Sequence, residues 1–197
     1  MCGIIGYSGP KEPLPILIGG LSRLEYRGYD SAGVAILDGE KLTIEKKEGK
    51  LQILKDHLEN SKINGNIGIG HTRWATHGVP NDVNAHPHSD NQKEFAIIHN
   101  GIIENYAEMK DDLLKEDFIF ESDTDTEVVA VELGNQWTGR LLETVTNVAK
   151  KLDGTYALVV TSTKEPGTIV AGRMMSPLVL GVGEGETFLA SDSAAIL

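Results

Sequence analysis

The last quarter of the chain contains four short apolar segments separated by connections of only three to five residues. They are YALVVTS (156–162), TIVAGR (168–173), PLVLGV (177–182) and TFLAS (187–191). Short runs rich in β-branched and aromatic residues, bounded by glycine and proline, are typical of β-strands. Because connections this short cannot join parallel strands, the pattern predicts antiparallel sheet.

The rest of the chain adds strands near the beginning and helices mostly in the middle. Predicted strands are CGIIGYS (2–8), a hairpin of SAGVAIL and KLTIEKKEG around Asp38-Gly39, NIGIGHTRWA (66–75), FAIIHNG (95–101) and FIFES (118–122). Predicted helices cover 15–28, 51–60, 104–115, 128–133 and 140–152. We therefore expect an α+β fold in which two sheets pack together and helices cover them outside.

Charge and cysteine content narrow the functional class. The net charge of −11 argues against nucleic acid or an anionic membrane as the main partner. Cys2 is the only cysteine, so no internal disulfide can form and a reducing, cytoplasmic location is expected. The sequence shows neither a signal peptide nor a run of eighteen apolar residues, so we expect a soluble protein.

The position of Cys2 suggests a chemical role. Removal of Met1 would give one residue both a thiol and a free α-amine. The pKa of a free thiol is about 8.5 and that of an α-amine about 7.7–8.0, so the amine can accept the thiol proton near neutral pH. The alternative is a buried, unreactive cysteine, which is the commoner state of a cysteine in general.

A second cluster is HNG (99–101), which ends an apolar strand. The Asn100 amide and the Gly101 N–H could together form an oxyanion hole, although Asn-Gly is also a common turn. Here it is followed by Ile-Ile-Glu-Asn rather than by a returning strand, which weakens the turn interpretation.

Two further clusters could bind an amino acid. Arg73, in HTRWATHG (71–78), could hold a carboxylate in a bidentate pair, and Asp125, in SDTDTE (122–127), could bind an ammonium group near the Thr76 hydroxyl. Both could instead be ordinary surface charges or helix caps. Asp123 or Thr124 could cap the helix while Asp125 points inward.

Other patterns carry less information. His86 and His88 in NAHPH match no usual zinc spacing, and no segment matches a dinucleotide-binding or P-loop motif, so we expect neither a metal nor a nucleotide cofactor. Trp137 is expected in the core. Trp74 lies in a polar segment where it could act as a lid.

Seven motifs together resemble one enzyme family. They are MCGIIGYSG, LEYRGYDSAGVA, HTRWATHG, NAHPH, HNGIIENY, ESDTDTEV and SPLVLG. The chain resembles the glutaminase domain of the glutamine–fructose-6-phosphate aminotransferases, a branch of the class II glutamine amidotransferases. The resemblance implies a four-layer αββα sandwich of the N-terminal nucleophile hydrolase type.

The same resemblance implies roles for residues. Cys2 would be the nucleophile with its own α-amine as base, and Asn100 and Gly101 would form the oxyanion hole. Arg73 would hold the glutamine carboxylate, and Asp125, with Thr76 and His77, the amino end. Trp74 would gate an ammonia channel. No metal or organic cofactor would be needed.

The resemblance also implies domains and partners. We expect one glutaminase domain over residues 1–197, with the sugar isomerase portion absent from this chain. The full-length enzyme would be a homodimer acting on fructose 6-phosphate. Two alternatives stay open: the glutaminase domain of another class II amidotransferase, such as the phosphoribosyl-pyrophosphate or asparagine-forming kind, and a non-catalytic glutamine-sensing module.

Overall fold

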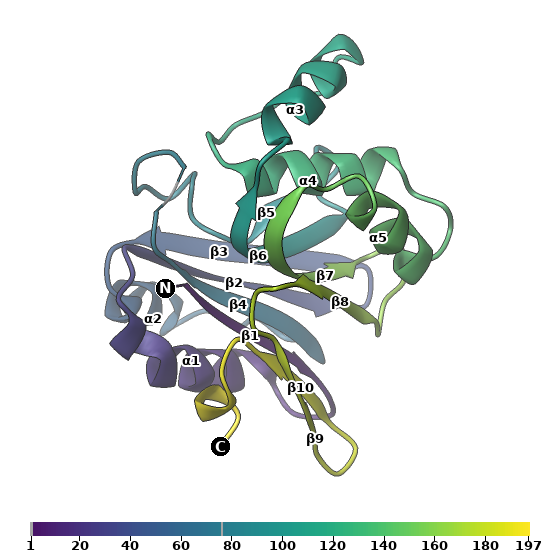
Figure 1. Ribbon diagram of the computed structural model, residues 1–197. Helices are drawn as coiled ribbons and strands as arrows, with labels where there is room; N and C mark the ends of the chain where they lie inside the picture. The colour runs from purple at the N-terminus through teal and green to yellow at the C-terminus, as the bar shows by residue number, and fades with distance from the viewer. Residues whose placement is uncertain (1, 76) are drawn as a thin grey trace.

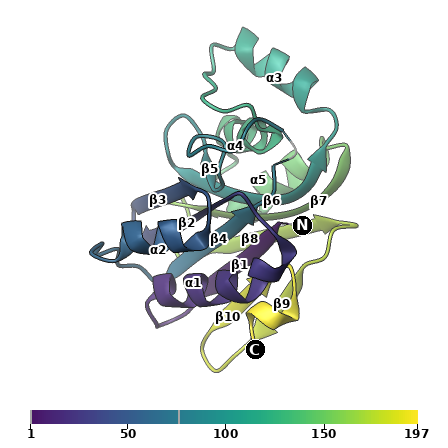
Figure 2. The ribbon, with the colours of Figure 1, turned by 90° about the vertical axis from the view of Figure 1, so that its left-hand side faces the viewer.

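The computed structural model describes residues 2–75 and 77–197, which form a layered α+β structure (Figure 1). Two antiparallel sheets lie face to face at its centre, and helices cover the outer face of each sheet (Figures 1 and 2). The expected two-sheet sandwich is therefore observed as an αββα arrangement.

Within the described residues, the first sheet has six strands in the order β3-β2-β4-β1-β10-β9. They are β1 (Gly3–Ser8), β2 (Ser31–Asp38), β3 (Lys41–Glu48), β4 (Ile67–Arg73), β9 (Val179–Val182) and β10 (Thr187–Ala190). Helices α1 (Pro13–Leu24) and α2 (Leu51–Leu58) pack against it. Their buried leucines contact Ile5, Val34 and Ile36.

The second sheet has four strands in the described part of the chain, in the order β5-β6-β7-β8. They are β5 (His88–Ser89), β6 (Phe95–Ile103), β7 (Gly154–Ser162) and β8 (Ile169–Met174). Helices α4 (Asp125–Asn135) and α5 (Leu141–Ala149) cover its outer face through a core that contains Phe95, Val129 and Val145. Helix α3 (Tyr106–Lys115) packs against α4 and projects beyond the sandwich (Figure 1).

The two sheets share an apolar interior layer. Ile4, Ala35 and Ile69 from the first sheet meet Ile98 and Val159 from the second. Alternate residues of a strand point to the same face, so Ile69, His71 and Arg73 of β4 all face this layer. The polar side chains that follow the apolar ones along β4 therefore project between the sheets.

The four late strands are present and antiparallel, as predicted, but they do not form one meander. Strands β7 and β8 pair in the second sheet, whereas β9 and β10 pair in the first, where β10 lies beside β1. The chain therefore crosses between the sheets after Met174. Strand β10 brings the end of the chain next to its beginning.

The prediction of a strand at FIFES (118–122) is wrong, because this segment forms neither a strand nor a helix. Phe118 and Phe120 pack against Leu113 and Val128, which accounts for the alternating apolar pattern. The backbone N–H groups of this segment do not pair with a neighbouring strand. That of Phe118 donates to the Leu113 carbonyl oxygen, that of Ile119 to Asn91 Oδ1, and those of 121 and 122 to the Glu127 carboxylate. None of the helices described is long and apolar enough to cross a membrane.

Candidate active site

A cavity of about 520 Å³ lies where β1 begins and where β4 and β6 end. This volume is typical of a pocket for a small molecule. Its lining includes the predicted site residues Cys2, Arg73, Trp74, Asn100, Gly101 and Asp125. Residues far apart in the sequence are thus brought to one site.

Hydrogen bonds of its thiol and its carbonyl oxygen hold Cys2 at the edge of this cavity. The thiol donates to the Trp74 carbonyl oxygen at 3.6 Å. The thiol also accepts a hydrogen bond from the Trp74 N–H at 3.2 Å. The Cys2 carbonyl oxygen accepts from Asn100 Nδ2 at 3.2 Å and from Arg27 Nη1 at 3.4 Å. Burial raises the pKa of the Cys2 thiol, while the Trp74 hydrogen bond and the Arg73 charge oppose that shift. A group that removes the thiol proton would therefore be required to make it a nucleophile near neutral pH.

Asn100 and Gly101 lie inside strand β6 and not in a turn. They pair with Ala157 and Tyr156 of β7. Gly101 has a φ of +123°, and a Cβ built on it would lie 1.9 Å from the Thr155 carbonyl oxygen. Only glycine fits this backbone.

Arg73 is almost completely buried at the end of β4. One guanidinium nitrogen, Nη2, donates a hydrogen bond to the His77 carbonyl oxygen, and the other, Nη1, has no hydrogen-bond partner among the described residues. Burial lowers the pKa of Arg73, and the nearby Asp30 and Asp125 carboxylates oppose that shift. A buried guanidinium with an unused donor can bind a carboxylate ligand.

Asp125 is the first residue of α4 and is buried, with 4% of the residue exposed. Its Oδ2 accepts a hydrogen bond from the Ile103 N–H at 2.9 Å, and its carboxylate lines the cavity. The helix is capped by Thr124, whose hydroxyl accepts from the Glu127 N–H at 3.2 Å. As predicted, a neighbouring residue caps the helix while Asp125 faces inward.

Trp74 lies at the rim of the cavity and is 54% exposed. Its indole packs over Gly28, where an added Cβ would lie 2.4 Å from the ring. Gly28 also has a φ of +74°, so both its conformation and this contact favour glycine.

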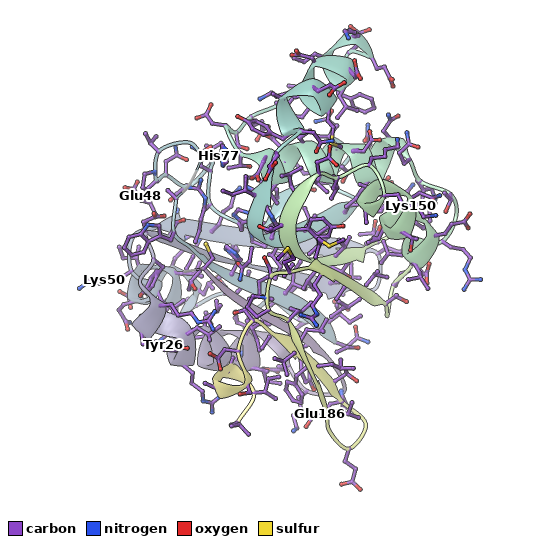
Figure 3. The ribbon with its side chains drawn as sticks, in the orientation of Figure 1. Tyr26, Glu48, Lys50, His77, Lys150 and Glu186 are labelled. Carbon is purple, nitrogen blue, oxygen red and sulfur yellow. The ribbon has the colours of Figure 1, made fainter. Side chains whose placement is uncertain are left out.

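The other residues predicted for this segment are placed differently. His77 is not among the residues that line the cavity: its ring packs edge-on against Tyr106, with ring centres 5.2 Å apart. Figure 3 shows it on the loop beside the base of α3. Thr76 lies outside the described residues. Trp137 packs against Phe95 in the outer core of the second sheet, as predicted.

Several other cavity residues received no catalytic or substrate-binding role from the sequence, where His86 was considered only as a metal ligand. His86 Nε2 and His99 Nδ1 both lie within hydrogen-bonding distance of Thr126 Oγ1, at 2.8 and 2.9 Å. Burial lowers the pKa of both histidines, so both are neutral near pH 7. Arg27, which contacts the Cys2 carbonyl, lies in LEYRG, a motif read only for its family resemblance. Within the described part of the chain, no group of three or more histidine, cysteine or acidic residues could hold a metal ion.

Comparison with known proteins identifies the family. The profile of the "Glutamine amidotransferase domain" family matches residues 71–197. The chain belongs to this family. The glutamine–fructose-6-phosphate aminotransferases of Aquifex aeolicus and Clostridium acetobutylicum are 54% and 52% identical to it over its whole length. The resemblance noted from the motifs is therefore confirmed.

Two further comparisons concern length and fold. The chain spans about a third of the length of these relatives, 33% and 32%. The solved structure of glutamine phosphoribosylpyrophosphate amidotransferase from B. subtilis, complexed with ADP and GMP, superposes with a TM-score of 0.86 at 31% identity. That match covers 99% of this chain and 43% of the other. It confirms the expected αββα fold of the N-terminal nucleophile hydrolase type.

Proposed function

We propose that this glutamine amidotransferase domain hydrolyses the side-chain amide of L-glutamine to glutamate and ammonia. The observation that carries the proposal is the convergence of Cys2, Asn100, Arg73 and Asp125 on one cavity. These groups supply a nucleophile, an oxyanion donor, a cation for a carboxylate and an anion for an ammonium group.

The reaction begins once Met1 has been removed. The free α-amine of Cys2 takes the thiol proton, and Sγ attacks the amide carbon of glutamine. The Asn100 amide and the Gly101 N–H stabilise the negative oxygen of the tetrahedral intermediate. The proton passes to the leaving nitrogen, ammonia departs, and a thioester remains on Cys2. Water then attacks the thioester and releases glutamate.

Arg73 and Asp125 hold the other end of the substrate in this proposal. The buried guanidinium binds the α-carboxylate of glutamine, and the Asp125 carboxylate binds its α-ammonium group. His77 supports that end through its backbone carbonyl oxygen, which accepts a hydrogen bond from Arg73, and Trp74 covers the cavity. The proposal also assigns Thr76 to the amino end of the substrate. The chemistry requires no metal or organic cofactor.

In the full-length protein we propose that the ammonia passes to a sugar isomerase domain and aminates fructose 6-phosphate to glucosamine 6-phosphate. The support is the higher identity to glutamine–fructose-6-phosphate aminotransferases, 54%, than to the phosphoribosylpyrophosphate enzyme, 31%. A homodimer and a cytoplasmic location stay predictions. Measuring ammonia transfer to fructose 6-phosphate by the full-length protein tests the sugar branch against the other class II branches.

Covalent labelling tests the glutaminase activity itself. Incubation with 6-diazo-5-oxonorleucine, a reactive glutamine analogue, should add mass to the peptide that begins with Cys2, and glutamine should be converted to glutamate. The Cys2→Ala variant should fold normally, remain unlabelled and lose glutamate production. Turnover retained in Cys2→Ala would refute the nucleophile assignment. Glutamine binding without turnover or labelling in the processed wild type would favour a sensing module.

A further inference from the structure

The side-chain amide of Asn100 is fixed from both sides. Its Nδ2 lies 3.2 Å from the Cys2 carbonyl oxygen, and its Oδ1 lies 2.9 Å from His71 Nε2. A carbonyl oxygen can only accept a hydrogen bond, so the amide nitrogen must face Cys2 and the amide oxygen must face His71. The orientation of the amide therefore follows from its neighbours.

The Asn100 amide in turn fixes the proton on His71. The Asn100 amide oxygen can only accept, so His71 Nε2 must carry the hydrogen that it donates. The other ring nitrogen, Nδ1, has no hydrogen-bond partner among the described residues. A neutral imidazole protonated at Nε2 satisfies this arrangement.

His71 reaches Asn100 across the sandwich. It lies on β4 of the first sheet, opposite Ile4 of β1, and is completely buried, whereas Asn100 lies on β6 of the second sheet. Burial lowers the pKa of His71 to about 3. The imidazole therefore keeps one form throughout the neutral range, which suits a fixed hydrogen-bond donor better than an acid or a base.

The orientation of Asn100 matters for the chemistry. The oxyanion site requires the amide nitrogen, because an amide oxygen in the same place would repel the developing negative charge. The two ends of an asparagine amide have nearly the same shape, so packing alone does not select between them. The acceptor at the Nδ2 end, the Cys2 carbonyl oxygen, and a hydrogen-bond donor at the Oδ1 end select the orientation together.

We propose that His71 is a positioning residue for the oxyanion site, whose Nε2–H locks the Asn100 amide with its nitrogen toward Cys2. This inference rests on the proposed glutaminase function for its effect on rate, but the hydrogen bond itself can be tested without turnover. His71 touches neither the nucleophile nor the substrate in this scheme and acts through Asn100.

Kinetics of two variants test the effect on rate. His71→Leu removes the donor and should lower kcat for glutamine hydrolysis by about 10- to 100-fold, a part of the loss expected when an oxyanion donor is deleted. The KM for glutamine should change less than about threefold, because Arg73 and Asp125 are untouched. His71→Gln offers an amide nitrogen at a similar reach and should restore most of kcat. An unchanged kcat in His71→Leu would overturn the proposal.

Two controls separate positioning from structural damage. Ile69→Ala opens the same face of β4 two residues away and should lower stability while leaving kcat nearly unchanged. In an Asn100→Ala background, His71→Leu should lower kcat less than about threefold further, because residues that act through one another are not additive. A full additional loss in that background would contradict the proposal.

Imidazole NMR tests the proposed tautomer of His71 in the wild-type chain, independently of any activity or of the folding of a variant. Two-bond ¹H–¹⁵N spectra should show His71 protonated at Nε2 and not at Nδ1 from about pH 5 to pH 8. The opposite tautomer, or a charged imidazole in that range, would overturn the inference. A processed chain without glutaminase activity would overturn the proposed function instead, and the tautomer would still be read from the same sample.

Discussion

The floor and the rim of the cavity are built differently. The floor consists of side chains on strands and at a helix start, among them Arg73, Asn100 and Asp125, with Arg73 3% and Asp125 4% exposed. The rim includes Trp74, which follows β4 and is 54% exposed; Val79, further along the same segment, does not line the cavity and is 67% exposed. Groups that must keep one geometry lie on regular structure, and groups that cover a ligand lie on an exposed loop. Floor substitutions should therefore affect the reaction strongly and rim substitutions weakly.

The largest effect among these comparisons is expected for Asn100→Ala. Loss of one oxyanion donor should lower kcat by about 100- to 1,000-fold, or roughly 3–4 kcal/mol, with little change in KM. Steady-state assay of glutamate formation measures both constants. Asn105→Ala, at a loop outside the cavity where the amide binds Lys151 and Asp153, is the matched control and should keep kcat. A change in KM alone would remove Asn100 from the oxyanion site.

Arg73→Ala should weaken glutamine binding. Charge-assisted hydrogen bonds contribute about 1.5–3 kcal/mol, so the KM should rise roughly 10- to 100-fold while kcat changes less. Arg140→Ala, which removes an exposed arginine, is the control and should leave both constants unchanged. If the KM of Arg73→Ala equals that of the wild type, Arg73 does not hold the carboxylate.

Acid should lower the free energy of unfolding of the chain through its buried histidines. Burial lowers the pKa of His71, His86, His88 and His99 from the ordinary value of 6.5. The unfolded chain then binds protons that the folded chain does not, so stability falls as the pH falls below about 6.5. For His71 the loss continues toward its folded pKa of about 3. The slope is up to about 1.4 kcal/mol per pH unit for each histidine.

Urea unfolding at a series of pH values measures this slope. His88→Gln should make it shallower by up to one proton. Equal slopes in the wild type and in His88→Gln would show that the buried histidine does not contribute.

The smallest effect is expected at the rim. Trp74→Ala should change glutamine hydrolysis by no more than about threefold, as is usual for exposed side chains. In the full-length protein the same variant should reduce ammonia transfer to fructose 6-phosphate, if Trp74 gates the path between the sites. Val79→Ala, on the same loop, should affect neither. A large loss of hydrolysis in Trp74→Ala would show that the rim belongs to the rigid part of the site.

Local patterns in the sequence were sufficient for much of the fold. The amphipathic spacing of Leu17, Leu21 and Leu24 and the apolar runs of the strands depend on near neighbours, and these elements form as predicted. Such local patterns cannot predict which distant strands pair. The sequence TFLAS, for example, does not indicate that β10 pairs with β1. The segment FIFES has the alternating apolar pattern of a strand, but its two phenylalanines pack against Leu113 of α3 and Val128 of α4 instead of entering a sheet.

The site shows the same limit. Cys2, Arg73, Asn100 and Asp125 could be selected because each residue type suits one step of the chemistry and each lies in a recognisable motif. His71 could not, because its role depends on a contact with a residue 29 positions away in the other sheet. Its place at the end of an apolar strand, facing the interior beside Ile69, was the available signal.

The proposed mechanism depends most on the free amine of Cys2. The direct test compares two preparations of the same chain, distinguished by intact mass: one in which Met1 has been removed and one in which it is retained. Glutamate should be produced by the processed form, and the retained form should show only background hydrolysis and no labelling by the glutamine analogue. Equal turnover in both preparations would contradict the mechanism, because the thiol would then be activated without its own α-amine.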